Sequence, residues 1–308
     1  MADKGYIYLN DCPLCGSKNI TKKFKIFRNN DNVINKINIK FFETFLYECK
    51  FCKFNFSNPQ INNELLSKYY KFLDSEYYDY YQFETDISTL NSTREILCII
   101  KRLKHSGDIL EIGCGSGALL NYIEKSGEYK CVGLEPSPVA SNYGINEFGL
   151  NIKKELVGEI NPFKKKFNII LLIDVIEHLR QPLEVLKNLY FWLADDGIII
   201  VSTGNVKSVN ARTFRKFWGY FSSWEHISFF SKQSFYYLAK KTNYKILELK
   251  FFCYSDKKIK NIGFYFYNFY LIGKNILKYG IKILYPYKYK YSLSKLSNDH
   301  FIAVIKKS

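Results

Sequence analysis

The chain has 308 residues, of which 47% are hydrophobic and 24% are charged, and its formal net charge is +16. This composition excludes a disordered or fibrous protein, and the length suits one large domain or two smaller ones. The N-terminus lacks the apolar core of a signal peptide, and the longest uncharged stretch of the C-terminal third, Asn261–Gly273, is too short to cross a bilayer. We therefore expect a cytoplasmic protein whose eight cysteines stay reduced, so that paired cysteines indicate a metal site.

The positive charge is concentrated at the C-terminal end. Between Lys240 and Ser308 there are 15 lysines and three acidic residues, a net charge of +12. Such a segment indicates a nucleic-acid or anionic-membrane partner. Lys, Asn, Ile, Tyr and Phe are abundant along the whole chain, however, and a nucleotide bias of the coding sequence explains the lysines equally well.

Residues 1–58 carry two Cys-x-x-Cys motifs separated by 33 residues that contain short strand-like segments. Four thiolates in two such pairs suit a closed tetrahedral site, the arrangement of a zinc ribbon. A segment this small has little core of its own, so a metal would stabilise it. We predict one structural zinc ion, and the alternative is a set of buried free thiols. The predicted ligands are Cys12, Cys15, Cys49 and Cys52.

Residues 59–106 are predicted to form a helical, tyrosine-rich cover. From residue 108 onward, apolar strands alternate with helices, which is typical of a parallel sheet. One helix is expected to begin at Pro138 with Ser137 as its N-cap, and another to span Ser231 to Lys241. The expected strands are Asp108–Ile112, Lys130–Leu134, Ile152–Leu156, Phe167–Ile173, Gly197–Thr203, Lys245–Tyr254 and Phe301–Lys306, with an insertion at about 256–298 before the last strand.

A glycine-rich turn follows the first of these strands. Gly113, Gly115 and Gly117 would let the backbone approach a ligand closely. Glu135 ends the next strand, where an acid can hold both hydroxyls of a ribose. The third glycine comes one residue too early for a dinucleotide fingerprint, which favours an adenosyl ligand without phosphates.

Three further motifs complete a resemblance to the class I S-adenosylmethionine (SAM)-dependent methyltransferases. They are the Gly-acid-apolar motif at Gly158–Ile160, the strand exit at Asp174–Leu179, and the turn and strand at Ala194–Thr203. The resemblance implies an α/β fold with a Rossmann-like seven-stranded sheet whose last strand is antiparallel. It also implies a zinc-ribbon domain at 1–58, the helical cover at 59–106 and a methyltransferase domain at 107–308.

The resemblance assigns the cofactor-binding residues. Three glycines and an acid would line the methionine part, a second acid would hold the ribose, and the Gly-acid-apolar motif would flank the adenine. Asp174 lies at the carboxyl edge of the sheet, where ligands of open α/β sheets collect. The alternative for Asp174 and Glu111 is a loop-capping role. In that order the residues are Gly113, Gly115, Gly117, Glu111, Glu135, Glu159, Ile160 and Asp174.

The cysteine pairs and the segment Trp224–Ser231 narrow the resemblance to a bacterial subgroup that includes sugar C-methyltransferases and enzymes of surface-polysaccharide clusters. This implies methylation of a sugar, nucleotide-linked or part of a cell-surface glycan. An RNA methyltransferase with a zinc-ribbon recognition module is the alternative; the clustering of lysines behind the sixth strand, without arginine, disfavours nucleic acid. A scaffold with a degenerate site is disfavoured by the intact cofactor motifs.

His226 and Glu225 are the predicted catalytic residues. An imidazole is well matched to accept a proton near neutral pH, and Glu225 could act as a second acid–base group or bind a sugar hydroxyl. The subgroup places an acid–histidine pair in this stretch. The alternative is a structural His226 that ties its loop to Trp224 and Phe229, with Tyr77, Tyr78 or Glu225 as the next candidates for the base.

Two questions stay open at this stage. Asp174, Glu177 and His178 could bind a divalent ion, as the similar pattern of the ubiquinone-pathway O-methyltransferases indicates, or brace the following helix. Residues 263–285 form an amphipathic pattern with lysines on one face, which could lie on an anionic membrane or pack on the protein. The oligomeric state, the acceptor and the methylated atom are not determined by the sequence.

Overall fold

The structure is a computed structural model that describes residues 5–26, 43–62, 64–66, 68, 91–222, 225–252 and 298–308. Several predicted features therefore lie outside the described residues. They are the tyrosine pairs from Tyr69 to Tyr81, Trp224, Cys253, the amphipathic segment 263–285, and all but the last residue of the expected insertion.

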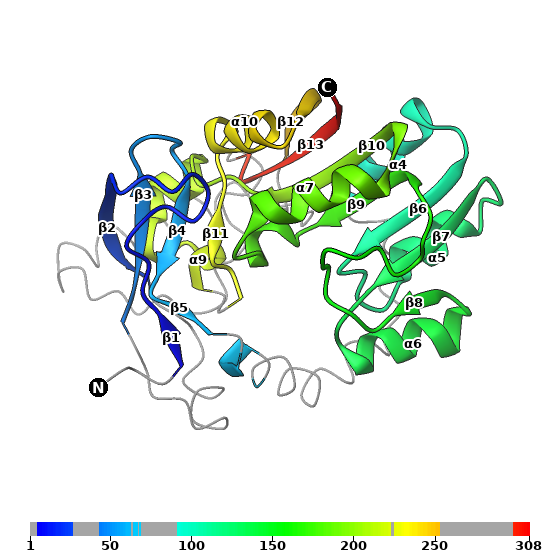
Figure 1. Ribbon diagram of the computed structural model, residues 1–308, viewed down its shortest axis with the longest axis horizontal. Helices are drawn as coiled ribbons and strands as arrows, with labels where there is room; N and C mark the ends of the chain where they lie inside the picture. Colours follow the sequence, from blue (N-terminus) through cyan, green and yellow to red (C-terminus); the bar gives the residue numbers. More distant parts are fainter. Residues whose placement is uncertain are drawn as a thin grey trace, which may run out of the picture.

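A seven-stranded sheet lies at the centre of the C-terminal two thirds of the chain (Figure 1). One strand runs antiparallel to both of its neighbours, and the other neighbouring pairs are parallel. The antiparallel strand is the last one in the chain, as expected. In spatial order the strands are β12 (Tyr244–Phe252), β13 (His300–Lys307), β10 (Leu193–Gly204), β9 (Phe167–Ile173), β6 (Gly107–Ile112), β7 (Tyr129–Leu134) and β8 (Asn151–Lys153).

The central strands are apolar on both faces because helices cover both faces of the sheet. Along β9, Ile169 and Leu171 belong to one buried cluster, while Ile170 and Leu172 belong to the other, as the alternation of side chains in a strand requires. The first cluster includes residues of α4 (Asn91–Leu103) and α5 (Ala118–Glu124), with α6 (Pro138–Phe148) packed against it; the second includes residues of α7 (Pro182–Trp192) and α10 (Lys232–Lys241).

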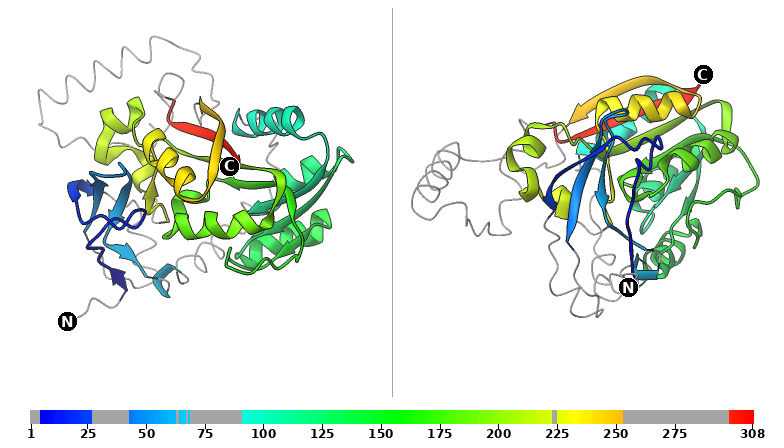
Figure 2. Two further views of the ribbon diagram at one scale, coloured as in Figure 1. Left: turned by 45° about the horizontal axis from the view of Figure 1, so that its top comes forward. Right: turned by 60° about the vertical axis from the view of Figure 1, so that its left-hand side comes forward.

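The N-terminal segments form a second sheet, which takes one of its strands from the C-terminal part of the chain. Its order is β11 (Ser228–Phe229), β4 (Asn55–Asn58), β3 (Thr44–Cys49) and β2 (Ile20–Ile26). A separate two-stranded ladder joins β1 (Tyr6–Ile7) to β5 (Gln60–Ile61). We call residues 5–26 and 43–62 the cysteine unit; the views in Figures 1 and 2 show it beside β11 and the end of the central sheet.

Short helical segments connect β9 to α7 and β10 to β11. The three segments after β10 lead the chain along the carboxyl edge of the sheet to β11, which pairs with β4 in the antiparallel direction. The segments are η2 (Ile176–His178), α8 (Val209–Phe214), η3 (Arg215–Phe217) and α9 (Gly219–Ser222).

The predicted strands of the central sheet all form, with two shifts at their ends. β8 stops at Lys153 instead of reaching Leu156, whose side chain is 72% exposed. β10 begins at Leu193, four residues early. The predicted N-cap is also confirmed, because Ser137 Oγ accepts a 3.0 Å hydrogen bond from the Ala140 amide.

Among the described residues, no helix combines the length and the apolar character that a membrane crossing requires. Two of the isolated cysteines, Cys114 and Cys131, are buried as expected of small apolar residues, whereas Cys98 is exposed on α4.

Candidate active site

The glycine turn lies between β6 and α5. Its three glycines have φ of 67°, 55° and 73°, the left-handed region that side chains disfavour. A Cβ at Gly113 would lie 2.6 Å from Cγ2 of Val175, and one at Gly117 would lie 2.4 Å from Cδ1 of Leu150. The Gly113 amide donates a 2.7 Å hydrogen bond to the carbonyl of Leu134 at the end of β7. The turn is therefore held close to the carboxyl ends of two strands, in a left-handed conformation at all three glycines and with no space for a Cβ at Gly113 and Gly117.

Two buried carboxyl groups flank this turn. The Glu135 oxygens accept 2.8 Å hydrogen bonds from the amides of Gly115 and Ser137. Glu111 is also buried, and its Oε2 has no hydrogen-bond partner. Burial, together with the charge of Glu135, raises the pKa of Glu111 to about 8. An unpartnered buried carboxyl beside a second carboxylate is a site for a positively charged ligand, and SAM carries both a sulfonium and an ammonium group.

Asp174 follows β9 on the other side of the turn. Its φ is 54°, its amide donates to the Ser202 carbonyl at 3.0 Å, and its Oδ1 accepts a 3.1 Å hydrogen bond from Ser202 Oγ. The residue is thus fixed at the carboxyl edge of the sheet, as expected. By contrast, Glu159 and Ile160 are exposed in the segment between β8 and β9, with Ile160 83% exposed.

Glu177 has a role that the sequence did not indicate. It does not cap α7, whose N-cap is Gln181; its carboxyl group is fully buried and accepts a 2.9 Å hydrogen bond from Thr203 Oγ1. Tyr220 Oη lies 3.0 Å from Thr203 Oγ1 and accepts from the Gly204 amide at 2.9 Å. Burial, with the charge of nearby Asp174, raises the pKa of Glu177 to about 8, while its second oxygen, Oε1, has no hydrogen-bond partner.

His226 lies beside this network. Its Nδ1 is 2.7 Å from the carbonyl oxygen of Tyr220. Because a carbonyl only accepts hydrogen bonds, Nδ1 carries the proton, and Nε2 of the neutral ring keeps its lone pair. The ring packs at 4.3 Å on the Tyr220 ring and edge-to-face at 4.9 Å on His178. His226 is therefore fixed by Tyr220, which the sequence pattern did not single out among its many aromatic neighbours.

The residue before it, Glu225, is half-buried and lies close enough to His178 for its charge to be felt there. Burial lowers the pKa of His178, and the charge of Glu225 opposes that shift. The structure thus brings both predicted catalytic residues to the place where Asp174 and η2 leave the sheet.

A candidate metal site includes His226 instead of Asp174. The ligand atoms of Glu177, His178 and His226 lie within 4.8 Å of one another, whereas the sequence indicated Asp174, Glu177 and His178. A carboxylate and two imidazoles could hold a divalent transition metal.

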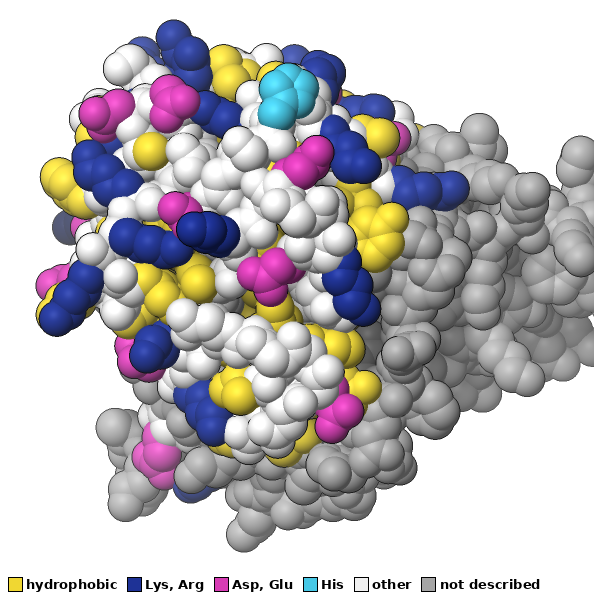
Figure 3. Space-filling model, turned by 90° about the vertical axis from the view of Figure 1, so that its right-hand side faces the viewer, with side chains coloured by type: hydrophobic (Ala, Val, Ile, Leu, Met, Phe, Trp, Pro, Cys, Tyr) yellow, Lys and Arg dark blue, Asp and Glu magenta, His cyan; other side chains and the backbone are white. Residues whose placement is uncertain are grey.

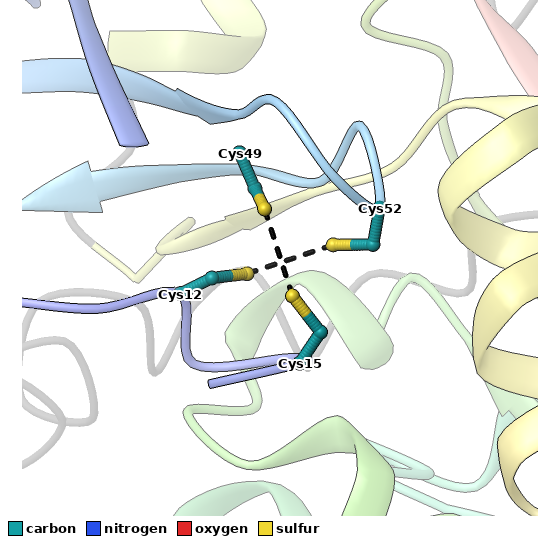
Figure 4. Close-up of side chains that lie close together, drawn as sticks. All are labelled: Cys12, Cys15, Cys49 and Cys52. Carbon is teal, nitrogen blue, oxygen red and sulfur yellow. Dashed lines mark hydrogen bonds between the residues drawn. The ribbon is translucent and has the colours of Figure 1, made fainter. Parts of the chain in front are cut away.

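The four predicted zinc ligands converge at the edge of the cysteine unit (Figure 4). The Sγ atoms of Cys12 and Cys52 are 3.6 Å apart, as are those of Cys15 and Cys49. A tetrahedron with metal–sulfur bonds of about 2.3 Å has edges of about 3.8 Å, so these distances suit zinc and exclude S–S bonds. The hydrogen bond from Cys52 lowers the pKa of Cys12 to about 6, whereas burial raises the pKa of Cys15 to about 11.

A methyltransferase-domain family model matches residues 87–249, just over half of the chain. The chain belongs to the class I SAM-dependent methyltransferases. The matched region contains the glycine turn, both flanking carboxyl groups, Asp174 and His226.

Curated relatives share this region but act on different molecules. A probable (S)-tetrahydroprotoberberine N-methyltransferase of Papaver bracteatum is 27% identical over 42% of this chain and 38% of its own length. A tRNA U34 carboxymethyltransferase of Sulfurimonas denitrificans is 31% identical over 31% of this chain and 34% of its own length. A ubiquinone biosynthesis O-methyltransferase of Bradyrhizobium diazoefficiens is 30% identical over 32% of this chain and 40% of its own length. The chain thus spans about two fifths or less of the length of these relatives.

Solved structures share the fold. Magnesium protoporphyrin IX methyltransferase of Synechocystis PCC 6803 superposes with a TM-score of 0.55 at 9% identity and covers 80% of this chain and all of that one. The plantazolicin methyltransferase BpumL has a TM-score of 0.52 at 18% identity and covers 80% of this chain and 93% of its own.

Proposed function

We propose that the protein transfers the methyl group of SAM to a sugar, either nucleotide-linked or part of a cell-surface glycan. The observation that carries the methyl-transfer part is the pair of buried carboxyl groups, Glu111 and Glu135, beside the left-handed glycine turn. The sugar is supported by the resemblance of the cysteine pairs and of the segment around His226 to the sugar-methylating subgroup. The relatives support only the cofactor part, because their named acceptors differ.

In this proposal the chain's own residues divide between cofactor and acceptor. Glu135 would hold the ribose while it keeps its two amide hydrogen bonds, and Glu159 and Ile160 would flank the adenine. Glu111 and the glycine turn would lie beside the positively charged methionine part, and Asp174 would close the site at the carboxyl edge of the sheet. When bound, SAM supplies an electrophilic methyl group on a sulfonium leaving group.

His226 is the proposed general base. Its Nε2 lone pair would accept the proton of the acceptor's hydroxyl or acidic C–H group as the methyl group bonds to that oxygen or carbon. Glu225 would bind a sugar hydroxyl or accept the proton in turn. A metal on Glu177, His178 and His226 would instead make His226 a ligand, so the assays are run with and without a chelator.

The experiment is a transfer assay with labelled SAM and fractionated nucleotide-sugars, glycans and RNA. Label in a sugar fraction supports the proposal. Label in RNA alone would favour the alternative of an RNA methyltransferase, and absence of SAM binding in calorimetry would refute both. RNA is disfavoured by the clustering of the C-terminal lysines behind the sixth strand without arginine. On the face drawn in Figure 3, the described basic side chains are interspersed with carboxylates.

We also propose one structural zinc ion on the four cysteines. The observation that supports it is the near-tetrahedral spacing of sulfur atoms. Purified protein should contain about one zinc ion per chain, and metal-free protein with unchanged folding would contradict the assignment.

A peripheral contact of residues 263–285 with the inner membrane face is a further proposal, supported only by the amphipathic pattern of the sequence. Flotation with anionic liposomes tests it, and recovery in the lipid-free fraction would reject it.

A further inference from the structure

The cysteine unit is connected to the segment of His226 by backbone hydrogen bonds. Cys49 is the last residue of β3, and β3 pairs with β4 so that Glu48 lies opposite Asn55. On its other edge β4 pairs with β11, and the Ser57 amide donates a 3.0 Å hydrogen bond to the carbonyl of Ile227. The four-cysteine centre therefore lies at the turn of a hairpin whose second strand holds the residue next to His226.

Ile227 is also hydrogen-bonded to the segment that follows β9 of the central sheet. The Ile227 amide donates a 3.0 Å hydrogen bond to the carbonyl of Glu177, and Ser228 Oγ donates a 2.7 Å hydrogen bond to the carbonyl of Leu179. Residues 227–229 are thus held between two elements, the η2 segment that follows β9 and β4 of the cysteine unit.

Side-chain packing joins the cysteine unit to the domain at the same place. Phe54 and Phe230 are both fully buried, with ring centroids 5.0 Å apart. Three of the four cysteines belong to the same buried cluster as Phe235 of α10 and Leu172 of β9. These aromatic and thiol side chains therefore share one core, and the cysteine centre is not packed as a separate module.

We propose that the metal-loaded cysteine centre is a positioning element for His226, acting through β4 and β11, so that proton transfer depends on the metal whereas SAM binding does not. The inference rests on the proposed function only for the role of His226. Of the proposed cofactor residues, Glu111, Glu135 and the glycine turn lie at the ends of β6 and β7, and Asp174 is bonded to Ser202 of β10; these hydrogen bonds do not involve β4 or β11. Loss of the metal should therefore loosen residues 225–229 and leave the residues around Glu135 in place.

Ser57 offers a matched pair of variants that leaves all four cysteines intact. Ser57→Pro removes the amide that binds the Ile227 carbonyl, whereas Ser57→Ala keeps it and removes only a hydroxyl that is buried without a hydrogen-bond partner. Hydrogen exchange of the full chain is compared for wild type, chelator-treated wild type and both variants, with zinc content measured in each.

In Ser57→Pro with zinc still bound, the Ile227 amide should exchange at least about tenfold faster than in untreated wild type. Metal-free wild type should show the same acceleration. The exchange rates in β6 and the SAM dissociation constant should stay within about twofold of their values in untreated wild type. Ser57→Ala should match wild type in the exchange rates and in SAM affinity. If an acceptor is labelled, kcat should fall in Ser57→Pro with KM for SAM unchanged.

Histidine NMR gives a second readout, because the chain has four histidines. The Nδ1–H tautomer of His226 should be fixed in wild type and lost in Ser57→Pro. If metal removal unfolds the whole chain, β6 included, its effect is not confined to residues 225–229 and the inference is overturned, whatever Ser57→Pro shows. Unchanged exchange and an unchanged His226 signal in that variant would overturn the inference, whereas failure of wild type to bind SAM would overturn the proposed function and leave this result standing.

Discussion

The two buried carboxyl groups beside the glycine turn, Glu111 and Glu135, differ in their hydrogen bonding. Glu135 accepts two amide hydrogen bonds, which favour its ionised form, whereas Glu111 is buried with one oxygen unpartnered. Both residues were predicted from the sequence because they belong to a local strand–turn–helix motif. Glu177 was predicted as a metal ligand or a brace of the following helix, but not its burial against Thr203 and Tyr220, which reach it only through the packing of distant segments.

Glu111 predicts that SAM binding releases a proton. Burial raises the pKa of Glu111 to about 8, so the free protein holds a proton there at pH 7. A cation placed beside the carboxyl group favours its ionised form, and SAM affinity should rise as pH increases from about 6 to 8. Calorimetry in buffers of different ionisation enthalpy should detect the release, which should disappear in Glu111→Gln and persist in the exposed control Glu147→Gln. Equal release in both variants would assign the proton elsewhere.

His226→Gln tests the proposed base. Glutamine offers no basic nitrogen, so kcat should fall by about 100-fold or more while SAM affinity and melting temperature stay near wild type. The assay uses the acceptor fraction that wild type labels. Turnover close to normal would make Glu225, Tyr77 or Tyr78 the next candidates.

Among the helices and strands, the sequence predicted the ones that a local pattern of residue types marks. The strands of the central sheet are short apolar runs between turns, and α6 has its Ser-Pro start, so each could be located without knowing its neighbours. β11 has only two residues, and it exists because it completes a sheet with β4, about 170 residues earlier in the chain. Such a strand has no pattern of its own to recognise.

The glycine turn gives a prediction at the scale of elements. Gly113→Ala places a Cβ 2.6 Å from Val175 in a left-handed conformation, so the turn must shift. The conformation alone costs about 1–2 kcal/mol, and the shift should lower SAM affinity by at least about tenfold. Gly127→Ala is the control, because its φ is 78° but nothing lies within 4 Å of the added Cβ. It should lower the melting temperature while calorimetry finds wild-type SAM affinity; equal affinity losses would contradict the steric argument.

For the whole molecule, the two sheets share one buried apolar cluster, and buried carboxyl groups in both sheets make stability depend on pH. Glu111 and Glu177 lie at the carboxyl edge of the central sheet. In the cysteine unit, burial acts to raise the pKa of Glu48, but its hydrogen bonds from Lys23 and Lys207 prevail and lower it to about 2. The sequence shows these charges but not their burial, because burial depends on how the two sheets meet.

The last prediction concerns the stability of the protein without SAM. Burial raises the folded-state pKa of Glu111 and Glu177 to about 8, above the ordinary value near 4.5, so their contribution is fully present below about pH 4.5 and is lost as pH rises to 8. Glu48 acts in the opposite sense, since its lowered pKa gives stability above about pH 4.5 that is lost towards pH 2. Denaturant unfolding between pH 5.5 and 8.5 should therefore show the free energy of unfolding falling with pH by up to about 1.4 kcal/mol per unit for each group. Glu111→Gln and Glu177→Gln should each flatten this slope, and Glu147→Gln should not. A slope that both glutamine variants leave unchanged would show that neither carboxyl group holds its proton in the folded protein.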